Sequence, residues 1–243
     1  MIFNFFKSKP TLKELIPKGF IDIHSHIIPG VDDGAKNIDE SLKLINEIKN
    51  LGFSKSVTTP HTYPGLYENT NESIKEKFNL IKNKYEKIII EYASEYLIDM
   101  SLLKKIDEKS ILTIKDNYVL LELSFISAPI NLYEIIFYFI TNGYSPIIAH
   151  PERYTYMFQD FKEFKKLKKV GCKFQLNLLS TTGYYGKHIS KISDILLKNN
   201  MVDFVGTDIH AARHIESIKK DKIQIESLKE LSIAMEKNIE IFK

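Results

Sequence analysis

The sequence predicts a parallel α/β fold, and three observations support this prediction. Short apolar, β-branched runs alternate with longer segments that have the 3.6-residue period of a helix. Glycine or asparagine closes several of the helical segments, at Gly52, Gly143, Gly171 and Asn200. The chain has 243 residues, 44% of them hydrophobic and 27% charged, which suits one soluble domain with a substantial core.

The expected elements follow in order along the chain. We expect strands at 20–24, 55–59, 87–95, 118–123, 145–149, 173–178 and 203–206. We expect helices at 38–51, 72–84, 132–142, 160–170, 189–199 and 223–238. Strands alternating with helices form a doubly wound sheet or a barrel, and alternation alone does not separate the two. Residues 1–18 are expected to be an N-terminal extension of a domain formed by 19–243.

The bulk composition excludes several classes of protein. The net charge is only +3, from 34 basic and 31 acidic residues, so the balance does not indicate a nucleic-acid partner. Cys172 is the only cysteine, so no intrachain disulfide can form and a reducing compartment fits. No run approaches the roughly 18 apolar residues of a membrane span. We therefore expect a cytoplasmic protein that meets a membrane only indirectly.

Histidines gather where the expected strands end. His24 and His26 are spaced i, i+2 at the end of the first strand, so their side chains point to the same face and can bind one metal ion. Three more histidines follow later strands: His61, His150 and His210. Four carboxylates occupy the same kind of position: Asp33, Glu95, Glu122 and Asp208. In parallel α/β folds this is the face on which active sites are built.

Glu122 is the most informative of these acids. It interrupts the run Val119-Leu-Leu-Glu-Leu, where a lone buried carboxylate would cost several kcal/mol unless it were paired, protonated or bound to metal. Four carboxylates and five neutral imidazoles exceed the ligands that one or two ions normally use. Three divalent ions would leave about +2 at the site, which would attract a phosphate monoester. Mixed histidine and carboxylate ligands suit manganese, iron or zinc.

Five motifs resemble one known family. They are DIHSHIIPGVDDG, TPH at His61, LLELS around Glu122, AHPERY from His150 to Tyr154, and GTDIH at His210. With them the chain resembles the PHP (polymerase and histidinol phosphatase) superfamily. More narrowly, it is similar to bacterial manganese-dependent protein tyrosine phosphatases of capsule and exopolysaccharide synthesis.

The resemblance implies a distorted, TIM-like (βα) barrel of seven strands around three divalent ions, manganese first, with iron or zinc as alternatives. His24, His26, Glu95 and Asp208 would hold one ion. Glu95 would bridge to a second ion held with Glu122 and His150. Asp33, His61 and His210 would hold the third. Arg153 corresponds to an arginine that the family places near the substrate phosphate.

The sequence leaves some assignments open. Glu91 is an alternative to Glu95, and Asp32 is an alternative to Asp33. Arg213 is a second candidate for the phosphate, with a surface position as the alternative. Tyr63 and Tyr67 are candidates to stack on a phosphotyrosine ring, as are Tyr184 and Tyr185, with simple packing as the alternative.

The expected reaction is hydrolysis of phosphotyrosine by in-line attack of metal-bound hydroxide, without a phosphoenzyme. The Cys-x5-Arg loop of cysteine-based tyrosine phosphatases is absent, since Leu178 lies six residues after Cys172. The resemblance implies a phosphotyrosine protein as substrate, the tyrosine-rich tail of a membrane kinase for polysaccharide synthesis. Three alternatives stay open: a small-molecule phosphatase such as histidinol phosphatase, a non-catalytic metal-bound regulatory domain, and an amidohydrolase.

Overall fold

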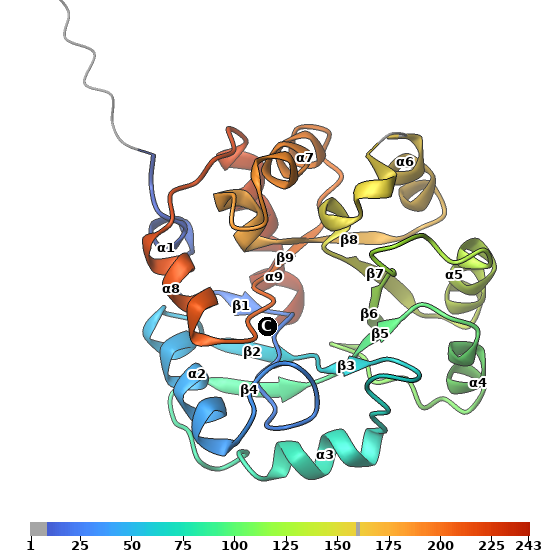
Figure 1. The fold of residues 1–243 in the computed structure, drawn as a ribbon, viewed down its shortest axis with the longest axis horizontal. Coiled ribbons are helices and arrows are strands. Elements are labelled where there is room, and N and C mark those ends of the chain that lie inside the picture. The colour runs from blue at the N-terminus through green and yellow to red at the C-terminus, as the bar shows by residue number, and fades with distance from the viewer. Residues whose placement is uncertain (1–8, 159–160) are drawn as a thin grey trace, which may run out of the picture.

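The strands form two parallel sheets that together close an irregular barrel (Figure 1). The structure is a computed structural model and describes residues 9–158 and 161–243. One sheet has the order β1-β2-β4 and the other has the order β3-β5-β6-β7-β8-β9. Their bounds are β1 Ile21–Asp22, β2 Lys55–Thr58, β3 His61–Thr62, β4 Ile89–Tyr92, β5 Glu95–Leu97, β6 Tyr118–Glu122, β7 Ser145–Ala149, β8 Lys173–Asn177 and β9 Phe204–Gly206.

Two continuous segments of chain join the sheets. β2 and β3 are separated by Thr59 and Pro60, and Pro60 has no N–H with which to continue the ladder. β4 and β5 lie alongside them, with Ala93 N donating to Thr58 O at 2.9 Å and Glu95 N donating to Pro60 O at 3.1 Å. On the other side, a parallel bridge between Ser25 and Ile209 links the chain after β1 to the chain after β9. These contacts close the ring of strands.

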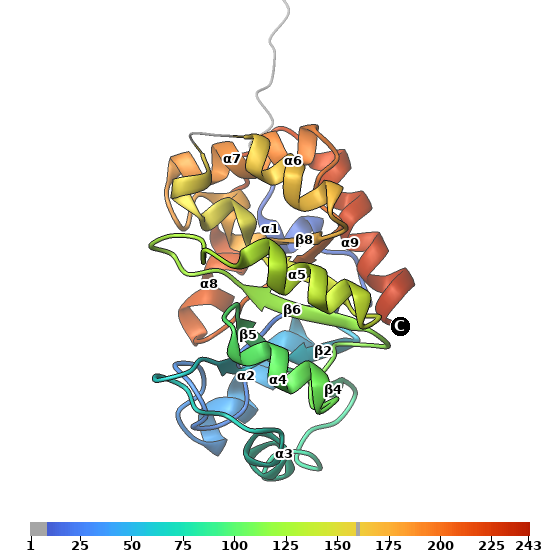
Figure 2. The ribbon, with the colours of Figure 1, turned by 90° about the vertical axis from the view of Figure 1, so that its right-hand side faces the viewer.

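Helices cover the outside of the barrel (Figures 1 and 2). Their bounds are α1 Leu12–Leu15, α2 Ile38–Asn50, α3 Asn71–Asn79, α4 Ser101–Asp107, α5 Leu132–Thr141, α6 Lys162–Lys169, α7 Lys187–Lys198, α8 Ala212–Lys220 and α9 Leu228–Phe242. Among the described residues, 3-10 helices lie at Pro151–Arg153, Thr155–Met157 and Leu178–Thr182. Asn37 caps α2, because its side chain accepts a hydrogen bond from Glu40 N at 2.9 Å.

The prediction of a barrel-like α/β fold is confirmed, but several bounds are wrong. The expected strand at 87–95 is divided into β4 and β5, and β3 is an additional strand. The helices α1, α4 and α8 were not predicted. The helix expected from 223 begins at Leu228, because Ile223 N and Gln224 N are hydrogen-bonded to Pro10 O and Thr181 O. Part of the expected extension (residues 1–8) and the expected helix start at Asp160 lie outside the described residues.

The alternation of side chains along β6 explains how a carboxylate enters the barrel. Val119 and Leu121 belong to the main core between strands and helices, whereas Leu120 belongs to a smaller apolar cluster with residues of β1, β2, β7 and β9. Glu122 lies two residues after Leu120 and so shares its face. The inner face of the strand is therefore apolar at its middle and acidic at its carboxyl end.

The amino-terminal end of the barrel is closed by α9. The ring of Phe242 is fully buried in the smaller cluster, at 4.9 Å from the ring of Phe204. Lys55 Nζ donates to the carbonyl oxygen of Phe242 at 3.1 Å, and Lys115 Nζ donates to that of Lys243 at 2.8 Å. These cations lie at the helix C-terminus, where the helix dipole favours positive charge. The opposite end of the barrel remains open to a pocket.

Candidate metal centre and active site

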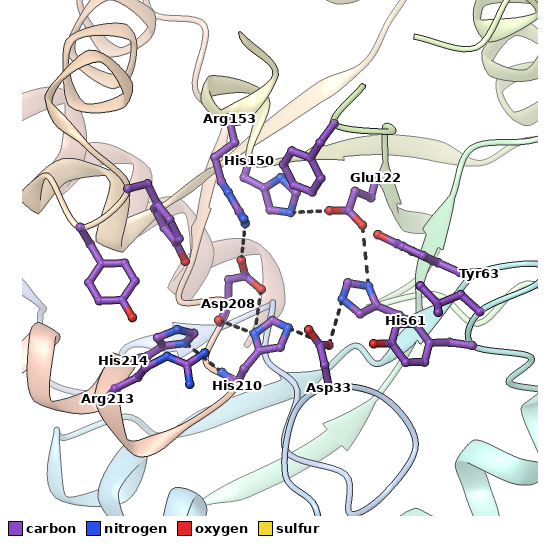
Figure 3. A pocket seen from close by; sticks show the side chains of 15 residues that line it. Asp33, His61, Tyr63, Glu122, His150, Arg153, Asp208, His210, Arg213 and His214 are labelled. Carbon is purple, nitrogen blue, oxygen red and sulfur yellow. Dashed lines mark hydrogen bonds and ion pairs between the residues drawn. The ribbon is translucent and has the colours of Figure 1, made fainter. Parts of the chain in front are cut away.

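A pocket of about 390 Å³ opens at the carboxyl ends of the strands (Figure 3). All nine residues predicted as metal ligands converge on this pocket or directly beneath it, and their potential ligand atoms form overlapping groups. The resemblance assigns these residues to three groups, one for each ion. Other predicted residues line it as well: Arg153, Arg213, Tyr63, Tyr67, Tyr184 and Tyr185. The fold thus brings together residues that lie as far apart in sequence as His24 and His210.

The first predicted ligand set is buried at the floor of the pocket, which Asp208 lines. His24 Nε2 and His26 Nε2 lie 3.2 Å apart, and each lies 3.3–3.5 Å from Glu95 Oε2 and from Asp208 Oδ1. Adjacent ligands of one ion with bonds of roughly 2.0–2.3 Å lie roughly 2.8–3.7 Å apart. These four side chains therefore have the spacing of ligands around one common centre.

The second and third groups adjoin the first. His150 Nε2 lies 3.2 Å from Glu95 Oε1 and 3.4 Å from Glu122 Oε1, so Glu95 directs one oxygen to each of the first two groups. Asp33 Oδ1 lies 3.5 Å from His61 Nε2 and 3.4 Å from His210 Nε2 (Figure 3). The other ring nitrogen of His61 lies 2.9 Å from Glu95 Oε2, so this histidine stands between groups.

Several buried polar atoms of the site lack hydrogen-bond partners. Within residues 9–158 and 161–243, no hydrogen bond reaches either carboxylate oxygen of Glu95, Oε2 of Glu122 or Nδ1 of His61. Burying a charged group without compensation is costly, and a buried carboxylate normally collects donors or a cation. The donor set is therefore one that divalent ions fit.

Residues behind the cluster orient the imidazoles. Gln175 Oε1 lies 2.7 Å from His24 Nδ1, and Asp32 Oδ2 lies 2.7 Å from His26 Nδ1. The carbonyl oxygen of Asp208 lies 2.9 Å from His210 Nδ1. A partner on Nδ1 that accepts its hydrogen leaves the Nε2 lone pair facing the centre, which is the arrangement that metal-binding histidines need.

The structure separates the alternatives that the sequence left open. Asp32 is buried and accepts hydrogen bonds from Gly34 N and His61 N besides facing His26, whereas Asp33 faces the pocket. Glu91 lies outside the cluster, half-exposed and paired with Lys55 Nζ at 2.8 Å. Glu95 and Asp33 are therefore the members of each pair that lie among the other candidate ligands.

Backbone strain coincides with the site. His150 (φ 33°) and Asp208 (φ 54°) adopt the left-handed region, although neither is glycine. Such conformations cost about 1–3 kcal/mol each and persist where the surrounding structure requires them. His150 directly follows β7 and Asp208 lies two residues after the end of β9, where these turns direct their side chains into the cluster.

The cluster is strongly coupled electrostatically. Burial opposes protonation of His24, but the carboxylates of Glu95 and Asp208 outweigh it and raise the His24 pKa to about 10. In the same way, Glu95 overcomes burial and raises the pKa of His61 to about 9. Burial would raise the pKa of Glu95, but His24 and His61 lower it well below its ordinary value. Without ions, the acids would favour the protonated imidazoles of His24 and His61.

Arg153 enters the pocket beside this cluster. Its Nη1 donates to Asp208 Oδ2 at 2.9 Å. Its guanidinium carbon lies 4.8 Å from the ring centre of Phe125 and 4.4 Å from that of Tyr185. Stacking between two rings fixes the guanidinium plane, and a single bond to Asp208 leaves other N–H donors for an anion. Arg213, on α8, lines the same pocket and is exposed.

Some residues of the site were not singled out from the sequence. Phe125 stacks on His150, with 5.7 Å between ring centres and 18° between planes. His214, which the sequence left unassigned, lines the pocket and accepts a hydrogen bond from His210 N at 3.0 Å. The signal for Phe125 was its position directly after the carboxyl end of β6. His214 follows a metal-type motif, but it lies on the unpredicted helix α8.

Comparisons with known proteins agree with this geometry. Residues 20–235 match the family model described as "Capsular polysaccharide synthesis, CpsB/CapC". Tyrosine-protein phosphatase CpsB of Streptococcus agalactiae is 32% identical over 200 residues, which cover 78% of this chain and 82% of the relative. Tyrosine-protein phosphatase YwqE of Bacillus subtilis is 28% identical over 195 residues, covering 78% and 77%.

Solved structures show the same fold. One match is described as YwqE from Bacillus subtilis and CpsB from Streptococcus pneumoniae, metal-dependent tyrosine phosphatases. It has a TM-score of 0.76 and 24% identity, and it covers 92% of this chain and 88% of that one. Histidinol phosphate phosphatase from Lactococcus lactis has a TM-score of 0.55 and 15% identity, covering 84% and 92%. Among the described residues, no helix is both long and apolar enough to cross a membrane.

Proposed function

Because the chain belongs to the CpsB/CapC family of capsular polysaccharide synthesis, we propose that it is a metal-dependent phosphatase that hydrolyses phosphotyrosine in proteins. The proposal rests on two features that lie side by side in one pocket. A buried cluster of histidines and acids has unpaired oxygens, and an arginine held between two aromatic rings lies beside it.

Three divalent ions fit the donor set. His24, His26, Glu95 and Asp208 would hold one, Glu95, Glu122 and His150 a second, and Asp33, His61 and His210 a third. Manganese is the first choice, with iron or zinc as alternatives, because the ligands mix imidazole and carboxylate. When bound, the ions would neutralise phosphoryl charge and lower the pKa of a coordinated water.

The side chains of the protein would bind and orient the substrate. Arg153 would contact the phosphoryl oxygens with the N–H groups that Asp208 does not use, and Arg213 would approach them from α8. Aromatic residues line the pocket, among them Tyr63 and Tyr67, whose ring centres lie 6.0 Å apart. These walls suit the flat ring of a phosphotyrosine, which is long enough to reach the cluster from the rim.

The chemistry needs no nucleophilic side chain. Cys172 is buried outside the pocket, and burial raises its pKa to about 12, so a thiolate mechanism is not supported. The leaving group is a phenolate, whose conjugate acid has a pKa of about 10, so departure places a modest demand on general acid catalysis. We therefore infer hydrolysis without a phosphoenzyme.

The substrate would be a phosphotyrosine protein that acts in capsule or exopolysaccharide synthesis. The tyrosine-rich tail of a membrane kinase fits this role, and a cytoplasmic location fits such a substrate. The choice of a phosphotyrosine protein as substrate is supported by the family description and by the relatives named tyrosine-protein phosphatases.

Steady-state kinetics test the proposal. We expect a phosphotyrosine peptide to be hydrolysed with a kcat/KM at least about 10²-fold higher than a phosphoserine peptide or histidinol phosphate, with activity lost on metal chelation and restored by Mn²⁺. A preference for histidinol phosphate would favour a small-molecule phosphatase. Absence of turnover on every monoester in the Mn²⁺-loaded protein would favour a non-catalytic domain.

Arg153→Lys tests the role of the guanidinium. Lysine keeps the charge but loses the planar fork, so we expect kcat/KM for the phosphotyrosine peptide to fall by about 10²-fold with metal content unchanged. Lys187→Ala, an exposed site that does not line the pocket, provides a control. An unchanged kcat/KM in Arg153→Lys would show that the guanidinium of Arg153 does not contribute to phosphate binding.

A further inference from the structure

The loop between β6 and α5 is apolar and exposed. Residues 123–131 read Leu-Ser-Phe-Ile-Ser-Ala-Pro-Ile-Asn and carry no charge. Ile126 is 89% exposed and Ile130 is fully exposed. Single exposed apolar residues are common, but this one short uncharged loop exposes two isoleucines almost completely, and we refer to these two side chains as the apolar patch. Exposed apolar patches mark binding surfaces.

The base of this loop belongs to the pocket. Phe125 lines the pocket, stacks on His150 and covers one face of the Arg153 guanidinium. Its neighbour in sequence, Ile126, lies at the start of the exposed part of the loop. The exposed part of the loop therefore begins at the residue next in the chain to a wall of the candidate active site.

A second loop carries an apolar side chain at the same mouth. Leu66, in the loop between β3 and α3, lines the pocket and is 67% exposed. Figure 2 shows the two loops projecting on the same side of the molecule, beyond the carboxyl end of β6. These two loops form one side of the rim over which a polypeptide would lie when it places a side chain in the pocket.

Geometry indicates which residues of a bound peptide would meet the loop. The phosphate has to reach Arg153 at the cluster, so the tyrosine Cα stays near the rim. An extended chain advances about 3.3–3.6 Å per residue, and side chains at i and i+2 point to the same side. Residues two positions from the phosphotyrosine would therefore face the protein about 7 Å from its Cα.

We propose that the loop of residues 123–131 is a specificity element that binds an aliphatic or aromatic side chain two residues from the phosphotyrosine, through Ile126 and Ile130. This inference rests on the proposed phosphatase function and adds the sequence class of its peptide substrate. Peptides with polar residues at both positions would be poorer substrates, because the two isoleucines would stay exposed.

A peptide accounts for the patch better than a bilayer does. Surface segments that bind membranes usually combine apolar anchors with lysine or arginine, and residues 123–131 contain neither. Because Ile126 is next in the chain to Phe125, which lines the pocket, the patch also begins beside the place where the substrate would lie.

Three synthetic peptides test the proposal. The first is Ser-Ile-Ser-pTyr-Ser-Ile-Ser, the second has serine in place of both isoleucines, and the third carries the isoleucines next to the phosphotyrosine. We expect the Mn²⁺-loaded protein to prefer the first peptide over the second by about five- to tenfold in kcat/KM, the effect of partly burying an isoleucine. The third peptide should resemble the second, because its isoleucines point away from the protein.

Variants then assign the preference to the loop. In Ile126→Ser/Ile130→Ser the ratio between the first two peptides should fall to within about twofold, whereas Ile233→Ser, an exposed site on α9, should retain it. The ratio is measured on one enzyme sample, so differences in metal content cancel. The side chains are exposed, so their loss should not unfold the protein.

Other results would overturn the proposal. Phenyl phosphate turnover with no preference among the peptides, or a preference that survives the double substitution, would reject the loop but leave the phosphatase function intact. If the protein sedimented with vesicles of phosphatidylcholine and phosphatidylglycerol and the double substitution abolished this, the patch would be a membrane-binding surface. If the protein formed a dimer that the double substitution abolished, the patch would be a dimer interface. If no aryl phosphate were hydrolysed, the phosphatase function would fail, and fluorescence anisotropy with the same peptides would still test the loop.

Discussion

Two fully buried carboxylates of this protein have opposite surroundings. Asp22, on β1, accepts hydrogen bonds from Thr207 Oγ1 at 2.6 Å and Thr207 N at 2.9 Å, which tie β1 to the chain after β9. Glu95, at the start of β5, accepts no hydrogen bond within the described residues and faces imidazole nitrogens instead. Asp22 thus has the donors that a structural carboxylate collects, whereas Glu95 keeps its oxygens free of hydrogen bonds, as a cation ligand would.

Replacing Glu95 would produce the largest effect. In Glu95→Gln one oxygen and the negative charge between the first two groups are lost, so we expect metal to be lost and kcat/KM for a phosphotyrosine peptide to fall by at least about 10³-fold. Metal content by elemental analysis and steady-state rates check this. Glu91→Gln is the matched control, because Glu91 lies outside the cluster. A Glu95→Gln protein that retains its full metal content would contradict the comparison.

Asp22→Ala should lower the stability of the protein and leave its metal binding unchanged. It leaves Thr207 Oγ1 and Thr207 N without their buried acceptor, so we expect the free energy of unfolding to fall by about 2–3 kcal/mol. Urea unfolding measures the change, and the protein that remains folded should bind as much metal as the parent. Loss of metal without loss of stability would show that Asp22 belongs to the metal centre.

Asp32→Asn tests an intermediate case. The carboxylate of Asp32 is buried like that of Asp22, but it faces His26, a candidate metal ligand. The substitution removes the carboxylate behind His26 Nδ1 while retaining a similar shape. We expect the affinity for Mn²⁺ to fall by about 10- to 100-fold, as measured by competition with a chelator. Equal Mn²⁺ affinity in the variant and the parent would show that Asp32 only stabilises the turn, through its hydrogen bonds from Gly34 N and His61 N.

The smallest expected effect is a dependence on pH. Glu95 and Asp208 raise the pKa of His24 to about 10 against burial, and Glu95 raises that of His61 to about 9. Their raised pKa values stabilise the metal-free protein fully below about pH 6.5, and this stabilisation is lost as the pH rises through 9 to 10.

Thermal melts of metal-free and Mn²⁺-loaded protein check this. Between pH 7 and pH 10 the melting temperature should fall more steeply without metal, because bound ions replace the protons on the imidazoles. Groups remote from the cluster contribute equally to both samples, so the difference between the two slopes is the informative quantity. Parallel slopes would mean that the cluster does not hold the histidines protonated.

Local patterns in the sequence predicted most of the scaffold. The strand at Ser145–Ala149 was placed to the residue, because its apolar run is bounded by Gly143 before it and Pro151 after it. The division of 87–95 was missed, since β4 pairs with β2 whereas β5 pairs with β3 and β6. That division depends on partners distant in sequence, and periodicity does not report them. The short helices α4 and α8 were missed because they hold only a few apolar positions.

The sequence by itself indicated the chemistry: which histidines and acids lie near the ends of strands, that an acid interrupts a buried run, and that the loop of a cysteine-based phosphatase is absent. Only the tertiary structure decided which acid of each neighbouring pair faces the centre, and that Phe125 and Tyr185 enclose Arg153. The physical reason is that Asp32 and Asp33 lie in an irregular loop, and Glu91 and Glu95 lie on different strands, so the closure of the barrel decides which acid points inward. Residue type is a local property, whereas convergence on one point depends on the whole ring of strands.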